Sequence, residues 1–234
     1  MINLENRSAE KELLDNPAVP FADIKRNMQE LNKINRYLGG HRVTIEGLKK
    51  TLLNHKLTQP ITICEIGCGG GDNLQALSDW CHSKGIPCLF IGIDIKPECT
   101  SYAAEQYPAL NAEWITSDYS EVRFNQQPAI IFCSLFCHHF SHDELVSMLR
   151  WMRENARFGF FINDLHRHLL AYYSIKLLTQ VFSRSYLVKN DAPLSVARGF
   201  LKTEWGRILD AAGLSKYSIS WQWAFRHLIV YRND

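Results

Sequence analysis

Short apolar runs alternate with longer amphipathic stretches from Ile61 onwards. Five runs have the composition of buried strands, namely ITICEI, PCLFIGID, AEWITSD, AIIFCSLF and FGFFIND. Segments of helix length, such as NLQALSDWCHSKG and CTSYAAEQY, separate several of them. Strands that are apolar throughout are typical of parallel sheets covered on both faces, and their alternation with helices indicates βαβ units. The pattern predicts an α/β protein with a Rossmann-like, mostly parallel sheet and helices on both faces.

The C-terminal stretch KYSISWQWAFRHLIVYR has a different pattern. Apolar and polar positions alternate along it, with an interruption near residues 224–226. This arrangement is typical of a β-hairpin, so we expect an antiparallel hairpin at the sheet edge. Trp221 and Trp223 would share one face of it, and we expect both to be core residues.

The first part of the chain, residues 1–57, is more polar and shows helical spacing. In ELNKINRYLGGHRVTIEGLKKTLL, apolar positions recur at helical intervals on both sides of Gly39 and Gly40. Because paired glycines interrupt helices, the sequence predicts two helices joined by a turn.

A further stretch, LLAYYSIKLLTQVFSRSYLV, runs from Leu169 to Val188 with helical spacing and few charges. We expect one helix here. In one interpretation it is a lid over an apolar ligand, with Tyr172, Tyr173 and Phe182 facing that ligand. In the other it packs on the sheet or forms a contact in a homodimer.

Charge and hydropathy exclude several classes of function. The formal net charge is +2, the sequence pI is near 8.1, and no run of five like charges occurs. A nucleic-acid partner is therefore not expected. The N-terminus lacks the apolar region of a signal peptide, and no apolar stretch approaches the length of a membrane span. We expect a cytoplasmic protein without stable membrane insertion.

The seven cysteines do not suggest disulfides, because their number is odd and all lie in the middle of the chain. Cys133, Cys137, His138 and His139 could in principle bind zinc. Their spacing is not C-x₂-C, however, and no second pair lies at a finger-like distance. We expect buried thiols and no metal site.

The glycine-rich stretch CEIGCGGGDNLQAL joins the first predicted strand to a predicted helix. Such a turn allows a ligand to approach the backbone closely, and the helix N-terminus offers free N–H groups. Gly67, Gly69 and Gly71 follow a G-x-G-x-G spacing, whereas the dinucleotide motif would need glycine in place of Asp72. A pyrophosphate is therefore a poor match, and a nucleoside a better one.

Three carboxylates are expected around this turn. Glu65 lies beside the glycines, Asp94 ends the second predicted strand, and Asp118 follows the third. An acid at the end of the second strand is suited to bind a ribose hydroxyl pair. Three acids near one nucleoside favour a ligand that carries positive charge and no phosphate.

Together these features resemble the class I S-adenosylmethionine-dependent methyltransferases, whose first motif, E/D-x-G-x-G-x-G, is present at residues 65–71. The resemblance covers about residues 58–234 and implies a seven-stranded sheet. It implies that the Gly67 to Gly71 loop and the segment Cys133, Ser134 and Leu135 contact the methionine part of S-adenosylmethionine. It also implies that Asp94, followed by Ile95, binds the ribose, and that Asp118 and Tyr119 contact the adenine.

A closer likeness lies in INRYLGGHR, CSLFCHHFSHDEL, FINDLHRH and DAPLSVARGF. These segments resemble small-molecule methyltransferases associated with type III polyketide synthases, which are similar to quinone-biosynthesis methyltransferases. The likeness implies that residues 1–57 form a helical lid within the same domain as residues 58–234. The stretch at about residues 165–198 would be a helical insertion.

Methyl transfer to a phenolic hydroxyl is helped by a base, and histidine is suited to take a proton at neutral pH. We predict His139, which precedes Phe140 in the H-H-F stretch of the family, as this base, and His166 as the next candidate. His138, His142 and His168 are more readily explained as structural or surface residues.

The predicted function is therefore S-adenosylmethionine-dependent methylation of a hydroxyl on a small apolar aromatic or polyketide-derived molecule. Two alternatives remain: C-methylation of a quinol-type ring, and a non-catalytic S-adenosylmethionine-binding protein. The fourth predicted strand is followed by Cys133-Ser134-Leu135-Phe136 and not by N-P-P-Y or D-P-P-Y. This difference disfavours methylation of amino groups on bases.

Overall fold

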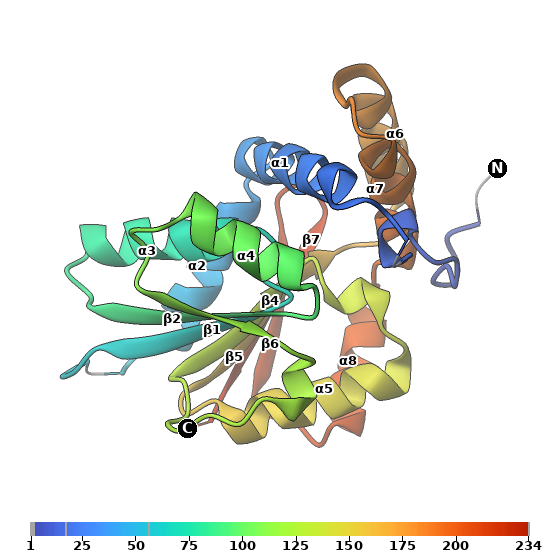
Figure 1. Cartoon of the computed structure of the whole chain (residues 1–234). Helices are drawn as coiled ribbons and strands as arrows, with labels where there is room; N and C mark the ends of the chain where they lie inside the picture. Colours follow the sequence, from blue (N-terminus) through green and yellow to red (C-terminus); the bar gives the residue numbers. More distant parts are fainter. Residues whose placement is uncertain (1–2, 17, 56, 234) are drawn as a thin grey trace.

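The computed structural model describes residues 3–16, 18–55 and 57–233 of the chain. At its centre is a seven-stranded sheet with the strand order β3-β2-β1-β4-β5-β7-β6 (Figure 1). The strands are β1 (Ile61–Ile66), β2 (Cys88–Asp94), β3 (Ala112–Thr116), β4 (Ile130–Ser134), β5 (Gly159–Leu165), β6 (Tyr217–Gln222) and β7 (Arg226–Arg232). Strands β1 to β5 are parallel, and β7 runs antiparallel to both β5 and β6. The predicted Rossmann-like sheet with a C-terminal antiparallel hairpin is confirmed.

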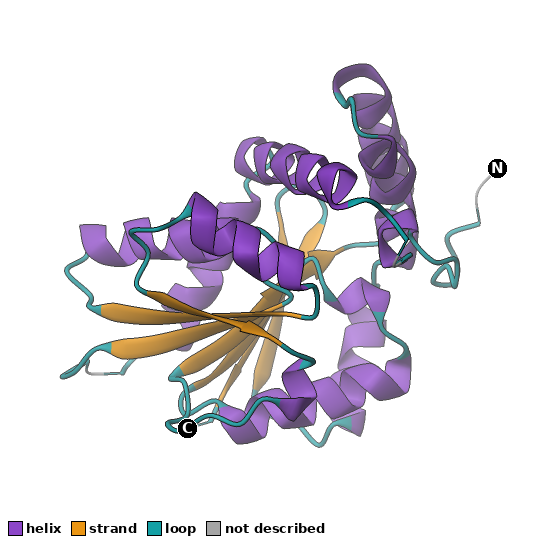
Figure 2. Ribbon diagram, in the orientation of Figure 1, coloured by secondary structure: helices purple, strands orange, loops and turns teal. Residues whose placement is uncertain are grey.

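Helices cover both faces of the sheet (Figure 2). One face packs against α2 (Gly40–Thr51) and α3 (Asp72–Ser83), and the other against α5 (His142–Asn155) and α8 (Lys202–Ala211). The other helices are α1 (Phe21–Tyr37), α4 (Pro97–Gln106), α6 (Leu169–Phe182), α7 (Tyr186–Arg198) and the 3₁₀ helices η1 (Leu13–Asp15), η2 (Tyr119–Glu121) and η3 (Cys137–His139).

Neighbouring residues of one strand supply the two cores. In β1, the side chain of Ile63 belongs to the core under α2 and α3, and that of Cys64 to the core under α5 and α8. Both are fully buried. Successive side chains of a strand point to opposite faces, so a strand covered on both sides must be apolar throughout. This explains why the inner strands lack the polar alternation of the C-terminal hairpin.

The two N-terminal helices meet at the predicted glycine turn. Gly39 adopts a left-handed conformation with φ of 75° and precedes the first residue of α2. Such a φ favours glycine, which has no Cβ. Helix α2 then packs against β5 and β7, while α1 lies at the end of the sheet where the parallel strands finish (Figure 1).

The stretch from Leu169 to Val188 contains two helices, and the expectation of one helix was wrong. Helix α6 ends at Phe182, and Ser185 caps α7 through the N–H of Val188. Between them, the carboxylate of Glu30 in α1 accepts a hydrogen bond from the Arg184 N–H at 3.1 Å. The break is therefore stabilised by a residue distant in sequence.

Trp221 and Trp223 are not core residues, contrary to the expectation. Their exposed fractions are 53% and 71%. Strand β6 ends at Gln222, so Trp223 lies in the hairpin turn and does not share a strand face with Trp221.

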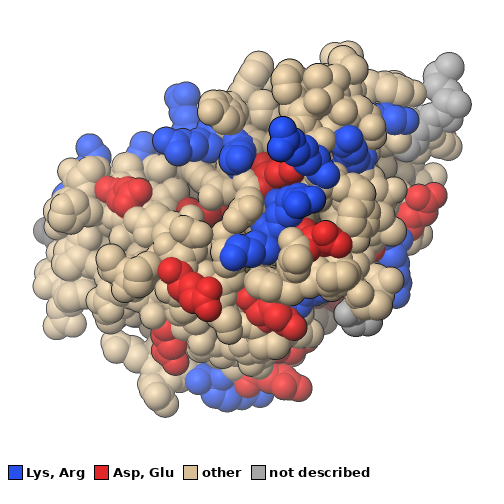
Figure 3. All heavy atoms as spheres, turned by 45° about the horizontal axis from the view of Figure 1, so that its top comes forward, with Lys and Arg blue, Asp and Glu red and all other residues tan. Residues whose placement is uncertain are grey.

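Within the described part of the chain, we find no helix with the length and apolar character needed to cross a bilayer. On the face shown in Figure 3, many Lys and Arg side chains lie across the upper part of the view, and most Asp and Glu side chains lie below them.

Candidate active site

A cavity of about 480 Å³ lies at the carboxyl ends of the central strands. In an open α/β sheet this edge is where ligands bind. Its floor comes from the glycine loop after β1 and from the segments that follow β2, β3 and β4. Its walls come from η1, η3 and α1. Residues of these elements that line it include Leu14, Asp15, Asn27, Met28, Asn35, Gly67, Gly69, Asp94, Ile95, Asp118, Tyr119, Ser134, Phe136, His139 and Phe140.

The glycine loop requires glycine for two separate reasons. Gly67, Gly69 and Gly71 have φ values of 68°, 50° and 78°, a left-handed conformation that L side chains rarely adopt. In addition, a Cβ at Gly67 would collide with the ring of Phe136, and one at Gly71 would come within 2.6 Å of the Trp114 ring. Gly67 and Gly69 line the cavity, whereas Gly71 does not and serves the packing of α3 on the sheet.

Asp94 ties the end of β2 to this loop. One carboxylate oxygen accepts the N–H of Gly69 at 2.9 Å, and the other accepts the N–H of Lys96 at 3.0 Å. Burial raises the pKa of Asp94, and these backbone hydrogen bonds act against the rise. Each oxygen keeps a lone pair that a ligand hydroxyl can use. Ile95 also lines the cavity and is 67% exposed.

Glu65 lies behind the loop and does not line the cavity. Its carboxylate accepts a hydrogen bond from the Asn73 amide at 2.9 Å, and Asn73 is itself part of the cavity wall. Burial raises the pKa of Glu65 well above its usual value. The structure therefore places Glu65 as a support for Asn73 and the loop.

Asp118 and Tyr119 line the cavity after β3. The Asp118 carboxylate accepts hydrogen bonds from the Ser120 N–H at 2.8 Å and from its hydroxyl at 2.7 Å, which caps η2. Burial raises the pKa of Tyr119 to about 12, so this phenol stays neutral at physiological pH. The pair offers one exposed carboxylate and one flat ring surface.

The segment after β4 only partly follows the prediction. Ser134 and Leu135 line the cavity, and Leu135 has a left-handed φ of 53°, an uncommon conformation for a bulky residue that is often found at functional sites. Cys133 is fully buried in the core with its Sγ 3.4 Å from Cys137 Sγ, and does not line the cavity.

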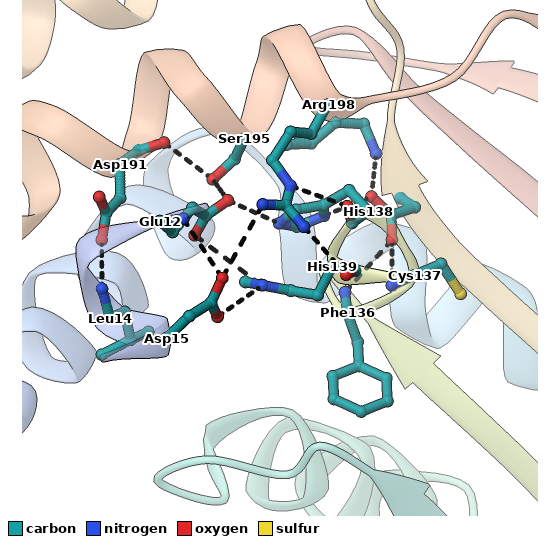
Figure 4. A network of polar contacts seen from close by, with 12 residues as sticks. Glu12, Leu14, Asp15, Phe136, Cys137, His138, His139, Asp191, Ser195 and Arg198 are labelled. Atoms are coloured by element: carbon teal, nitrogen blue, oxygen red, sulfur yellow. Dashed lines mark hydrogen bonds and ion pairs between the residues drawn. The ribbon is translucent and has the colours of Figure 1, made fainter. Parts of the chain in front are cut away.

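His139 projects from η3 to the cavity wall beside the N-terminal segment, residues 3–16, which precedes α1 and includes η1 (Figure 4). Its Nδ1 lies 3.1 Å from Asp15 Oδ1, and its Nε2 lies 3.8 Å from Glu12 Oε2. Burial raises the pKa of Glu12 to about 7. Neither acid was found by the sequence analysis.

Arginines place these acids. Arg198 donates to the Glu10 carbonyl in the N-terminal segment and to the His138 and His139 carbonyls in η3. Arg7 donates to the carbonyls of His138 and Phe140. Because each arginine has several donors in a fixed fork, a few side chains join two segments far apart in the chain.

Comparison with known proteins identifies a family for the central part of the chain. The model of a family described as a methyltransferase domain matches residues 63–159, which include the glycine loop, Asp94, Asp118 and His139. The chain carries a class I S-adenosylmethionine-dependent methyltransferase domain. The cofactor of this domain is S-adenosylmethionine. The left-handed glycines and Asp94 at the end of β2 fit that cofactor, since they provide close backbone approach and free acceptors for ribose hydroxyls.

Solved structures share the fold of the methyltransferase at low sequence identity. The plantazolicin methyltransferase BpumL in complex with SAH has a TM-score of 0.69 and 16% identity, with 94% of this chain and 92% of that chain covered. Human N-acetylserotonin methyltransferase in complex with SAM has a TM-score of 0.63 and 14% identity, with 90% of this chain and 55% of that chain covered. Magnesium protoporphyrin IX methyltransferase from Synechocystis PCC 6803 with bound SAH has a TM-score of 0.55 and 15% identity, with 86% of this chain and 87% of that chain covered. A search of curated protein sequences finds no match.

His166 lies away from the cavity of the methyltransferase. Its ring centroid is 4.7 Å from that of His227 on β7 and 5.6 Å from that of His168. Burial lowers the pKa of His166, with a smaller contribution from His168. His166 does not line the cavity, so the structure does not support its predicted role as the base.

Of the two interpretations of the helix after Leu169, the cavity gives the lid no support. Tyr172, Tyr173 and Phe182 of α6 do not line the cavity, and Phe182 is 77% exposed. Helix α6 instead projects beside α1 and α7 (Figure 1). The wall over the cavity is made by α1 and η1. On α1, Asn27, Leu31 and Asn35 recur at helical spacing on the inner face, a signal that could have been read from the sequence.

Proposed function

We propose that this methyltransferase transfers a methyl group to a hydroxyl of a small apolar aromatic or polyketide-derived molecule. The observation that carries the proposal is the position of His139, a base beside a carboxylate in an otherwise largely apolar wall. Bound S-adenosylmethionine supplies an electrophilic methyl group on a sulfonium. The protein positions the acceptor and receives its proton.

The cofactor side of the site is assigned to the floor of the cavity. Asp94 accepts hydrogen bonds from the ribose hydroxyls through its free lone pairs. Asp118 accepts one from the exocyclic amine of adenine, beside the ring of Tyr119. The loop from Gly67 to Gly71 and Ser134 contact the methionine part, with Gly71 and Glu65 acting through the shape of the loop. These assignments rest on the positions of the residues around one cavity.

The acceptor side is assigned to the wall made by η1, α1 and η3. Leu14, Met28, Leu31, Phe136 and Phe140 give this wall its apolar character. The rings of Phe136 and Phe140 pack edge to face, with centroids 4.8 Å apart. An apolar wall excludes water from the reaction and favours an apolar acceptor over a charged one.

His139 is assigned as the base. With Nδ1–H donating to Asp15, Nε2 carries the lone pair that takes the hydroxyl proton. Asp15 then stabilises the imidazolium that forms, as a carboxylate does for a catalytic histidine in other enzymes. The names of the structural neighbours refer to plantazolicin, N-acetylserotonin and magnesium protoporphyrin IX, so the shared fold does not by itself select the acceptor.

The test is to incubate the protein with methyl-labelled S-adenosylmethionine and a panel of phenols, alkylresorcinols, alkylpyrones and quinols, and to locate the label by mass spectrometry. We expect label on an oxygen of at least one apolar member. Label on a ring carbon would support C-methylation. Tight cofactor binding with no product from any acceptor would support a non-catalytic binding protein and contradict the proposal. A heat-denatured sample controls for non-enzymatic transfer.

A further inference from the structure

Three side chains that can bind a metal converge at the edge of the cavity. The imidazoles of His138 and His139 come from η3, and the carboxylate of Glu12 comes from the N-terminal segment (Figure 4). One ligand atom from each lies within 4.8 Å of the other two. Glu12 and His138 are 5% and 3% exposed. Among the residues that the structure describes, no other group of this kind occurs.

A second carboxylate orients each of the two imidazoles. His138 Nδ1 lies 2.8 Å from Asp164 Oδ1, and His139 Nδ1 lies 3.1 Å from Asp15 Oδ1. When Nδ1–H donates to a carboxylate, the neutral ring carries its lone pair at Nε2. Metal-binding histidines commonly have this carboxylate partner, which fixes the tautomer and raises the basicity of the ligand atom.

The distances to Glu12 suit an ion better than a direct hydrogen bond. His138 Nε2 lies 3.5 Å from Glu12 Oε1, and His139 Nε2 lies 3.8 Å from Glu12 Oε2. Charge-assisted hydrogen bonds are shorter, at about 2.7–2.9 Å. A tetrahedral ion with bonds of about 2.1 Å separates its ligand atoms by about 3.4 Å. Two lone pairs that face a buried carboxylate at this spacing are stabilised by a cation between them.

We propose that Glu12, His138 and His139 bind one divalent transition-metal ion, with zinc as the best match to two imidazoles and a carboxylate. Two imidazoles with one carboxylate are a known ligand set for zinc. The sequence predicted no metal site because the residues near the two histidines, Cys133 and Cys137, do not have zinc-binding spacing. Glu12, which completes the site, is distant in the sequence. The ion would join the N-terminal segment to η3 and so fix one wall of the cavity.

The inference rests on the proposed function for only one consequence. Nε2 of His139 has a single lone pair, which can either coordinate the ion or accept the hydroxyl proton. An occupied site therefore slows methyl transfer that depends on His139, and removal of the ion restores it. Binding of the ion itself needs neither the cofactor nor an acceptor.

The test starts from the full chain treated with EDTA and dialysed. Zinc is titrated by calorimetry in competition with a chromophoric chelator, and Co²⁺ is used as a spectroscopic probe of the ligand geometry. We expect one Zn²⁺ per chain and visible Co²⁺ bands of tetrahedral intensity. Glu12→Gln and His139→Gln should each weaken zinc binding by at least about tenfold, since loss of even an outer carboxylate partner weakens it by about 10–100-fold.

His142→Gln is the matched control, because His142 is exposed and lies close to the cluster in sequence. It should bind zinc as the wild type does. Circular dichroism checks that each variant is folded. Glu12 and His139 lie in different segments, so if one ligand variant misfolds, the other still tests the site. Absence of stoichiometric zinc binding in the wild type would overturn the proposal. So would wild-type affinity in both ligand variants.

The activity measurement separates this inference from the proposed function. If an acceptor has been found, zinc should inhibit the wild type and EDTA should reverse the inhibition. If no acceptor is methylated, the proposed function fails while the zinc titration still decides the metal site. Faster turnover with zinc bound would show that Nε2 of His139 is not both the zinc ligand and the acceptor of the hydroxyl proton.

Discussion

The carboxylate of Asp94 accepts a 2.9 Å hydrogen bond from the backbone N–H of Gly69. This bond joins the end of β2 to the loop after β1, so the residue assigned to the ribose also helps to shape the loop assigned to the methionine part. Loss of the Asp94 carboxylate should therefore affect both parts of the cofactor site.

We expect Asp94→Ala to weaken cofactor binding by about 1.5–3 kcal/mol, the scale of lost hydrogen bonds to a charged group, which is about 10- to 150-fold in affinity. Isothermal titration calorimetry with S-adenosylhomocysteine measures this. Asp79→Ala is the control, because Asp79 is exposed on α3, does not line the cavity and accepts a hydrogen bond from the Gln75 amide. Unchanged affinity in Asp94→Ala would remove the ribose assignment.

His139→Ala should lower kcat by about 10²- to 10⁴-fold in metal-free enzyme, the usual range for a positioned general base. Cofactor affinity should stay nearly constant. Raising the pH should recover part of the rate, because solvent then ionises a phenol with a pKa near 10. His166→Ala is the comparison and should keep most of its activity, since His166 does not line the cavity. If His166→Ala is the variant that loses activity, the base has been assigned to the wrong histidine.

Phe140→Ala should raise the KM for the acceptor, because the Phe140 ring lines the cavity and would leave an apolar contact unmade. Phe182→Ala should leave both KM and cofactor affinity unchanged, since Phe182 is exposed on α6. Steady-state kinetics with an identified acceptor compares the two. A larger KM effect in Phe182→Ala would restore the lid role of α6.

We expect His227 to make the folded protein less stable as the pH falls. Burial, with a smaller contribution from His166, lowers the pKa of His227 to about 4, against about 6.5 in an unfolded chain. Between these values the unfolded chain binds a proton that the folded chain does not, so the free energy of unfolding decreases as the pH falls. His227→Gln should lose less Tm between about pH 7 and pH 5 than the wild type. Exposed His82→Gln should behave like the wild type, and equal pH dependence in all three would rule out this contribution.

Much of the fold could be predicted because its signals are local. Ile63 and Cys64 are both apolar because a strand covered on two faces buries both, and this is visible in six residues of sequence. The loop at Gly67 and Gly69 could be predicted for the same reason, since left-handed turns between a strand and a helix select glycine at fixed spacing.

The remaining features depend on contacts between distant segments. Glu12 and Asp15 reach His139 only because arginines join η3 to the N-terminal segment, and nothing near residue 12 indicates this. The break after Phe182 likewise depends on Glu30 from α1. Residues two apart share one face only within a single strand, and β6 ends at Gln222, between Trp221 and Trp223. The prediction that the two tryptophans share a face therefore failed.

The arginine contacts have a consequence for how this protein can diverge among relatives. Arg167 and Arg198 bind the N-terminal segment through the carbonyl oxygens of Leu4, Glu5 and Glu10, not through their side chains. Every residue type offers the same carbonyl, so mutation can accumulate at these three positions while the path of the segment is preserved. Drift would then be restricted mainly at Arg7, whose side chain bonds the η3 carbonyls, and at the two acids that face the histidines.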